Sequence, residues 1–189
     1  SPEIERYIQE LYPLEDPILR EMEETGNQIN FPLVGPLVGR LLYQLTKMTA
    51  AKKIFEMGSG FGYSAFWFAL AMPEDGIIHL TDQSQKNLEL AKSFLTRGNL
   101  VHKAKFHVGD ALEVLEKTNE LFDLIFMDIH KELYPKALAL AKMKLKLGGM
   151  LIADNLLWFG QVLDRKGDAS TEGIKEFNQK LFNACDFIS

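Results

Sequence analysis

Three glycines alternate along the chain between a short apolar segment and a longer one. Residues 54–57 have the apolar character of a buried strand, and residues 63–71 have that of an apolar helix. The glycines between them are Gly58, Gly60 and Gly62. Glycines at a strand-to-helix turn let the backbone approach a ligand closely and leave the helix N-terminus open to an anion. This feature is typical of the ligand-binding half of an α/β fold.

From residue 53 onward the sequence predicts strands and helices in alternation. The strands are expected at residues 54–57, 77–81, 105–108, 121–127 and 150–153. The helices are expected at residues 63–71, 85–97, 111–117, 134–145 and 171–184, and Phe187 with Ile188 has the character of one more strand. Several strands are almost wholly apolar, which suits parallel strands covered by helices on both faces. The pattern predicts a doubly wound α/β fold.

The segment that precedes this core is predicted to be helical. Of two opening helices, the second has Asp16 as its cap, Pro17 at its first helical position and Gly26 as its stop. A third helix is expected from near Pro36 through Leu45.

Length and composition limit the class of protein. A chain of 189 residues with 47% hydrophobic residues suits a single globular domain, with a helical cap at residues 1–48 on a core at residues 53–189. The net charge of −5 counts against a general binder of nucleic-acid backbones, which carries a basic excess. One cysteine, Cys185, excludes an internal disulfide and a cysteine-built zinc site and suits a reducing cytoplasm. No apolar stretch approaches 18 residues, so no membrane span is expected.

Polar residues follow the predicted strands, at the sheet edge where ligands bind in such folds. Asp82 lies 20 residues after Gly62 and is placed to accept hydrogen bonds from both ribose hydroxyls of a nucleoside. Asp110 either caps the helix that follows it or accepts from an adenine amino group while the Ala111 N–H reaches a ring nitrogen. Both roles are open to one residue.

Two further strand ends carry oxygen donors. Asp128 precedes His130 and Lys131, and Asp154 is followed at once by Asn155. Because these two strands are neighbours in this architecture, the two carboxylates and the amide oxygen are expected to converge. Three hard oxygen donors with room for water suit Mg²⁺, with Mn²⁺ or Ca²⁺ as alternatives. The alternative, in which each aspartate only caps its own loop, is outweighed by the pairing of two such sites with a lysine.

Together these motifs resemble those of the cation-dependent class I O-methyltransferases, the catechol and caffeoyl-coenzyme A type. The resemblance extends from about Phe31 to Phe187. It rests on four motifs, at residues 56–64, 109–111, 128–131 and 153–155. It implies a Rossmann-like sheet in the order 3-2-1-4-5, a homodimer formed through the N-terminal helices, and S-adenosylmethionine as methyl donor.

The resemblance also implies roles for single residues. Those that would bind S-adenosylmethionine are Val34, Glu56, Gly58, Ser59, Ser64, Asp82, Asp110, Ala111 and Asp128. Asp128, Asp154 and Asn155 would bind the metal, and Lys131 would act as the base. The reaction would be methyl transfer to a hydroxyl of a catechol-like or other vicinal-oxygen small molecule, whose hydroxyl pKa the chelated cation lowers. Lys131 would then accept the hydroxyl proton.

Three features depart from the resemblance or stay open within it. His130 stands where relatives carry an acid or a tryptophan, so it is either a base, a substrate contact or without a role. Trp158 and Phe159 either stack on a planar substrate or pack inside the fold. The family's chain continues after Phe187 through a hairpin of two strands, which this sequence lacks, and we expect the sequence to be a truncated form.

Three other functions compete with this interpretation. A related enzyme that methylates a hydroxyl on a tRNA base would share the motifs, but the acidic composition counts against it. A nicotinamide oxidoreductase is disfavoured by the Gly-x-Gly-x-Gly spacing and by the Asp154–Asn155 pair. A non-catalytic module that binds S-adenosylmethionine is the third, and binding of the cofactor without turnover would indicate it.

Overall fold

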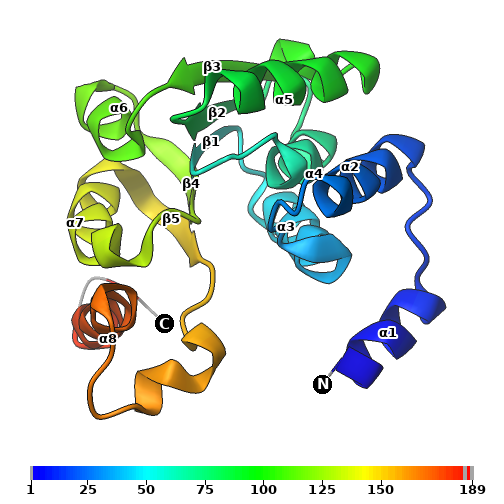
Figure 1. Cartoon of the computed structure of the whole chain (residues 1–189). Helices are drawn as coiled ribbons and strands as arrows, with labels where there is room; N and C mark the ends of the chain where they lie inside the picture. Colours follow the sequence, from blue (N-terminus) through cyan, green and yellow to red (C-terminus); the bar gives the residue numbers. More distant parts are fainter. Residues whose placement is uncertain (1, 185–186, 188–189) are drawn as a thin grey trace.

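The computed structural model describes residues 2–184 and 187, and its centre is a twisted parallel sheet (Figure 1). The strands are β1 (Lys53–Met57), β2 (Ile77–Asp82), β3 (Ala104–Val108), β4 (Phe122–Met127) and β5 (Leu145–Ala153). They lie in the order β3-β2-β1-β4-β5, and every neighbouring pair is parallel. The predicted α/β fold class and the strand order are therefore confirmed.

Helices cover both faces of the sheet, and each face has its own hydrophobic core (Figure 1). One core is covered by α2 (Pro17–Gln28), α3 (Gly35–Thr49), α4 (Tyr63–Ala71) and α5 (Gln85–Arg97). The other is covered by α6 (Ala111–Lys117), α7 (Tyr134–Lys144) and α8 (Ala169–Phe182). Side chains of successive strand residues pack into opposite cores, as those of Ile54 and Phe55 do, because side chains alternate across a strand.

The remaining elements lie at the ends of the chain and in the loops. Helix α1 (Pro2–Leu11) stands away from the sheet (Figure 1), and three short 3-10 segments are η1 (Val101–Lys103), η2 (Lys131–Leu133) and η3 (Trp158–Leu163). None of the helices within residues 2–184 has the length and apolar character needed to cross a membrane. Phe187 has no regular secondary structure, and Ile188, where a further strand was predicted, lies outside the described residues.

Helix α2 does not stop at Gly26 as predicted but continues to Gln28. Gly26 is buried inside the helix, and a β-carbon there would lie 2.7 Å from Cδ1 of Leu33. The glycine makes room for the chain segment that returns over α2, so it serves packing and not helix termination. Asp16 and Pro17 begin the helix as expected: Oδ1 of Asp16 accepts hydrogen bonds from the N–H groups of Ile18 and Leu19.

Strand β5 begins five residues earlier than predicted. Leu145 pairs with Phe122, the register then shifts, and pairing resumes where Met150 lies beside Leu124. Gly148, with φ of 79°, lies within the shift. The predicted start at Met150 was wrong because Gly148 and its glycine neighbour give this stretch the character of a turn.

Candidate active site

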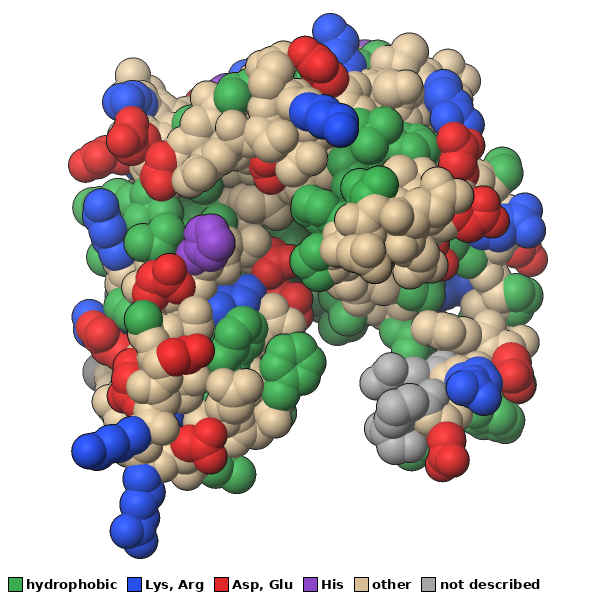
Figure 2. All heavy atoms as spheres, viewed as in Figure 1, with side chains coloured by type: hydrophobic (Ala, Val, Ile, Leu, Met, Phe, Trp, Pro, Cys, Tyr) green, Lys and Arg blue, Asp and Glu red, His purple; other side chains and the backbone are tan. Residues whose placement is uncertain are grey.

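A cavity of about 460 Å³ lies at the carboxyl ends of the strands, where Figure 2 shows a central hollow. Its walls come from the loops after β1, β2, β3 and β4, from residues 31–34, and from Trp158 and Ser170. The predicted residues that line it are Val34, Gly58, Ser59, Ser64, Asp82, Asp110, Ala111, Asp128, His130, Lys131 and Trp158. Glu56, Asp154 and Asn155 are not among the lining residues.

The three alternating glycines all have left-handed backbones, with φ of 83° at Gly58, 50° at Gly60 and 85° at Gly62. L-residues with a side chain rarely adopt this conformation. Gly58 is constrained further, because a β-carbon there would lie 2.2 Å from the carbonyl oxygen of Asp128. The turn after β1 is therefore packed directly against the end of β4.

Glu56 lies behind this turn and is fully buried. One carboxylate oxygen, Oε1, accepts a hydrogen bond from the Ser64 hydroxyl, and the other, Oε2, has no hydrogen-bond partner. Burial raises the pKa of Glu56 to about 7, although the nearby hydroxyls of Ser59 and Ser64 lower it and the charge of Asp128 adds to the rise. A buried carboxylate oxygen without a partner requires an explanation, and a cationic ligand group would supply one.

Asp82 and Asp110 lie at the ends of the next two strands. Oδ2 of Asp82 accepts from the Gly60 N–H at 3.0 Å, and Oδ1 accepts from the Ser84 N–H at 2.8 Å. Oδ1 of Asp110 accepts from the N–H of Leu112 at 2.9 Å, so the predicted role of Asp110 as a helix cap is confirmed. Both side chains also line the cavity, which leaves the predicted nucleoside contacts open to them.

Lys131 is buried, with a relative exposure of 6%, and its Nζ contacts two groups. Nζ donates to Oδ1 of Asp128 at 2.8 Å and to the hydroxyl oxygen of Tyr134 at 2.9 Å. Lys131 is therefore not a solvated loop lysine, which is the other interpretation that its sequence position allows. A lysine ammonium has three N–H donors, and these contacts leave one position of Nζ for a ligand in the cavity.

Tyr134 was not predicted as a site residue, yet it joins the two neighbouring strand ends. Its buried hydroxyl lies 2.9 Å from the carbonyl oxygen of Met127 and 3.1 Å from that of Asp154. Because the hydroxyl has one proton, it donates to one of these carbonyls at a time while it accepts from Lys131. The only signal in the sequence is a tyrosine three residues after the lysine, which by itself also fits an ordinary core residue.

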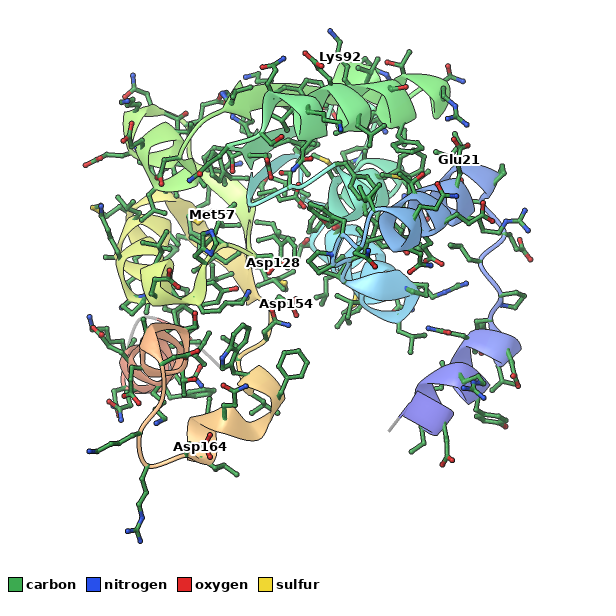
Figure 3. All side chains as sticks on the ribbon, in the orientation of Figure 1. Glu21, Met57, Lys92, Asp128, Asp154 and Asp164 are labelled. Carbon is green, nitrogen blue, oxygen red and sulfur yellow. The ribbon has the colours of Figure 1, made fainter. Side chains whose placement is uncertain are left out.

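Asp128 and Asp154 follow directly on Met127 and Ala153, which pair across β4 and β5. Figure 3 shows both aspartates at this edge of the sheet. Burial, and next to it the charge of Asp128, raises the pKa of Asp154. The two carboxylates are therefore brought together at a cost in electrostatic repulsion, as the sequence predicted.

Asn155 has a left-handed backbone with φ of 62°, and its N–H donates to Oδ1 of Asp154 at 2.9 Å. Within residues 2–184 and 187 there is no group of three or more His, Cys, Asp or Glu side chains arranged to hold a metal ion. The predicted metal site therefore depends on the amide of Asn155 as its third protein donor.

The open side of the cavity carries the remaining predicted residues. His130 is exposed and lines the cavity, whereas Trp158 is partly buried and both lines the cavity and packs against the second core. The Trp158 ring lies 5.9 Å from Nζ of Lys131. Phe159 is 88% exposed with its ring 5.8 Å from that of Trp158, so the alternative that it packs inside the fold is wrong.

Comparison with known proteins assigns the chain to a family. The sequence model of the family described as O-methyltransferase matches residues 9–186. Tapetum-specific methyltransferase 1 of Arabidopsis thaliana is 32% identical over 96% of this chain and 84% of its own length. Caffeoyl-CoA O-methyltransferase 1 of Zea mays is 34% identical over 86% of this chain and 67% of its own length. Catechol O-methyltransferase of Niastella koreensis is 29% identical over 94% of this chain and 84% of its own length.

Solved structures agree with this assignment. An O-methyltransferase from Bacillus cereus in complex with SAH has a TM-score of 0.90 and 27% identity, and the match covers 97% of this chain and 86% of that one. TomG, an O-methyltransferase from Streptomyces achromogenes in complex with SAM, has a TM-score of 0.89 and 28% identity over 96% of this chain and 85% of that one. The fold and the glycine-lined cavity are thus those of S-adenosylmethionine-dependent methyltransferases. Within that class, the chain belongs to the O-methyltransferase family.

Proposed function

We propose that the chain transfers a methyl group from S-adenosylmethionine to a hydroxyl of a catechol-like or other vicinal-oxygen small molecule, with Mg²⁺ as the metal. The observation that carries this proposal is the constellation of Lys131, Asp128 and Tyr134 beside the cavity, with Asp154 on the next strand. These groups combine a place for a hard cation with a buried amine. Such a pair suits ionisation of a hydroxyl.

The residues on the β1 side fit S-adenosylmethionine, which supplies a methyl group on a sulfonium. The partnerless oxygen of Glu56 would receive a ligand ammonium, and the left-handed glycines of the turn beside it support this role. Asp82 would bind the ribose, and Asp110 with the Ala111 N–H would bind the adenine. Val34 lies in the segment that closes the cavity from the N-terminal side.

The residues at the ends of β4 and β5 fit a divalent cation. Asp128 and Asp154 raise the electrostatic cost of each other's charge, and a cation held by both with Asn155 would relieve it. Carboxylate and amide oxygens are also the donors that Mg²⁺ prefers. When bound, such a cation orients two adjacent substrate oxygens and favours the ionised hydroxyl.

Lys131 would take the hydroxyl proton, for which the amine must enter the step uncharged. Tyr134 would hold Nζ in place, because its hydroxyl ties the lysine to the carbonyl groups at both strand ends. His130 and Trp158 would form the wall against the substrate ring. Positioned proton transfer of this kind contributes about 10²–10⁴-fold to a rate.

Two measurements test the proposal. Calorimetry with S-adenosylhomocysteine should show binding, and a panel of catechols should be methylated with Mg²⁺ but not with EDTA. Methylation that is equally fast in EDTA would overturn the metal requirement. Cofactor binding without turnover on any diol would favour the non-catalytic module, and methylation of bulk tRNA alone would favour the RNA-modifying alternative.

We further propose that two copies pair through the N-terminal helices. Helix α1 presents Ile4, Tyr7 and Leu11 to solvent with exposures of 60%, 62% and 55%. Light scattering of the intact chain and of a Tyr7→Glu, Leu11→Glu variant would test this. We expect the double variant to be monomeric, and an unchanged mass for the variant would exclude this interface.

A further inference from the structure

The substrate side of the cavity contains almost no positive charge. Lys131 is the only lysine or arginine among the lining residues, all of which belong to the described part of the chain. It is 6% exposed and already bound to Asp128 and Tyr134. In Figure 2 most lysine and arginine side chains stand at the outer surface, whereas acidic side chains lie in and beside the central hollow. A substrate with a carboxylate or phosphate tail would find no lysine or arginine here other than Lys131, which is already bound to Asp128 and Tyr134.

The rim of the same side carries a negative charge. Glu132 is not itself a lining residue, but it is exposed and lies in the sequence between two residues that are, Lys131 and Leu133. Its Oε2 accepts a hydrogen bond at 3.2 Å from the hydroxyl of Ser170, which also lines the cavity. Across residues 2–184, no lysine or arginine forms an ion pair with Glu132. Its charge is therefore balanced by no cationic side chain.

Aromatic and apolar groups complete the open side. Trp158 lines the cavity, and its neighbours Leu157 and Phe159 are 75% and 88% exposed. Such a surface accepts a flat ring, and the face of an aromatic side chain attracts a cation and not an anion. The scarcity of positive charge and the aromatic surface therefore both favour a flat substrate that carries no negative charge.

We propose that this site selects hydroxylated aromatics that are neutral or carry a protonated amine, and discriminates against those with an anionic tail. This inference rests on the proposed function and adds the charge class of the substrate to it. Glu132 is the specificity-determining residue on the rim. A unit charge that approaches it through partly hydrated space changes a rate by about three- to tenfold.

Three catechols with side chains of equal length test the inference, one ending in a methyl group, one in a carboxylate and one in an ammonium. The measured quantity is kcat/KM with saturating S-adenosylmethionine and Mg²⁺ at pH 8 and low ionic strength, where charge effects are least screened. We expect the ammonium and methyl compounds to exceed the carboxylate compound by at least about fivefold. Added salt should shrink that ratio.

Two variants assign the effect to the rim. Glu132→Lys should lower the ammonium-to-carboxylate ratio by about tenfold or more, and Glu132→Gln should produce roughly half of that change on a logarithmic scale. Glu176→Lys is the matched control, because Glu176 is an exposed glutamate on α8 that pairs with Lys180. It makes the same change in net charge away from the cavity and should leave the ratio unchanged.

The outcomes separate the inference from the function on which it rests. Equal or better turnover of the carboxylate compound, or a ratio that Glu132→Lys does not move, overturns the inference and leaves the methyltransferase proposal standing. Failure to methylate all three compounds by protein that binds S-adenosylhomocysteine overturns both.

Discussion

Two glutamates at opposite ends of the sheet, Glu56 in β1 and Glu120 in the loop before β4, have opposite surroundings. Glu56 lies near the carboxyl ends of the strands, fully buried with one oxygen unpartnered, and its pKa is raised to about 7 by burial. Glu120 lies near the amino ends of the strands and pairs with two lysines, Lys53 at 2.5 Å and Lys105 at 3.1 Å. The His79 ring lies 3.4 Å away and is uncharged near neutral pH, because burial lowers its pKa to about 4. Hydrogen bonds from Lys53 and then Lys105 lower the pKa of Glu120 to about 2.

The difference separates structural charge from functional charge. The side chains around Glu120 balance its negative charge, so this cluster contains no unpaired charge that a ligand would have to satisfy. Glu56 and Asp154 are left uncompensated, and both lie at the edge of the sheet where the cavity opens. A charge that the protein does not satisfy by itself is a better indicator of a binding site than charge density alone.

The largest expected effect on activity is at the carboxyl ends of the strands, where Asp154 lies. Asp154→Ala should abolish Mg²⁺-stimulated methyl transfer, a loss of about 10³-fold or more, because it would remove a donor to the proposed metal. Affinity for S-adenosylhomocysteine, measured by calorimetry, should change by no more than about threefold. The control is Asp123→Ala, which removes the carboxylate that accepts the N–H groups of Lys52 and Lys53 near the amino ends. It should cost about 1–2 kcal/mol of stability and leave turnover in place.

Lys131→Ala should lower kcat by about 10²–10⁴-fold, because the proposed proton acceptor would be lost. Lys105→Ala removes an equally charged side chain from the compensated cluster and should leave kcat within about twofold. Steady-state rates of both variants at saturating substrate make the comparison. If Lys131→Ala and Lys105→Ala lowered kcat equally, the distinction between functional charges at the carboxyl ends of the strands and structural charges at the amino ends would be wrong.

The glutamates themselves should respond in opposite directions. The folded-state pKa of Glu56 lies above the unfolded value, so its contribution to stability is present below pH 4.5 and is lost as pH rises to about 7. Glu56→Gln should therefore raise the free energy of unfolding at pH 8 by about 1–3 kcal/mol in the cofactor-free protein. It should also weaken binding of S-adenosylhomocysteine.

For Glu120 the sign is reversed. Its folded-state pKa is depressed, so its contribution is present above pH 4.5 and is lost as pH falls toward 2. Because solvent screens these surface partners, Glu120→Gln should lower stability at pH 8 by only about 0.5–1 kcal/mol. Urea unfolding of both variants at pH 3, pH 5 and pH 8 measures the two slopes, because the Glu120 contribution changes below pH 4.5 and the Glu56 contribution above it. If Glu56→Gln and Glu120→Gln changed the free energy of unfolding at pH 8 in the same direction, the contrast between the two glutamates would be refuted.

The smallest expected effect on the rate of methyl transfer is at Tyr134. Tyr134→Phe should lower kcat by about tenfold with an unchanged KM, because Lys131 loses one of its two hydrogen-bond partners. Tyr43→Phe removes a hydroxyl from the opposite side of the sheet and should leave kcat unchanged. A rise in KM with a normal kcat would mean that Tyr134 shapes substrate binding and does not position the lysine.

Most of the fold, and the site residues at the strand ends, could be predicted from patterns in the sequence. Alternating strands and helices predicted the sheet, and because ligands bind at strand ends, Asp82, Asp110 and Asp128 were found by position alone. Tyr134 was missed because its role depends on a hydroxyl that reaches two strand ends, which are brought together only by the fold. The exposure of Phe159 was equally hidden, since an aromatic residue in a loop usually indicates packing.

Gly58 has a consequence for how such an enzyme can change over evolutionary time. Since no β-carbon fits between this position and the Asp128 carbonyl oxygen, the turn after β1 and the end of β4 form a single joint. In the proposed reaction the turn would bind the methyl donor and the strand end would activate the acceptor. A mutation at this joint would damage both halves of the reaction at once, so neither half can be exchanged alone. New acceptor preferences must therefore arise on the outer parts, such as η3 and the rim, while the joint is inherited intact.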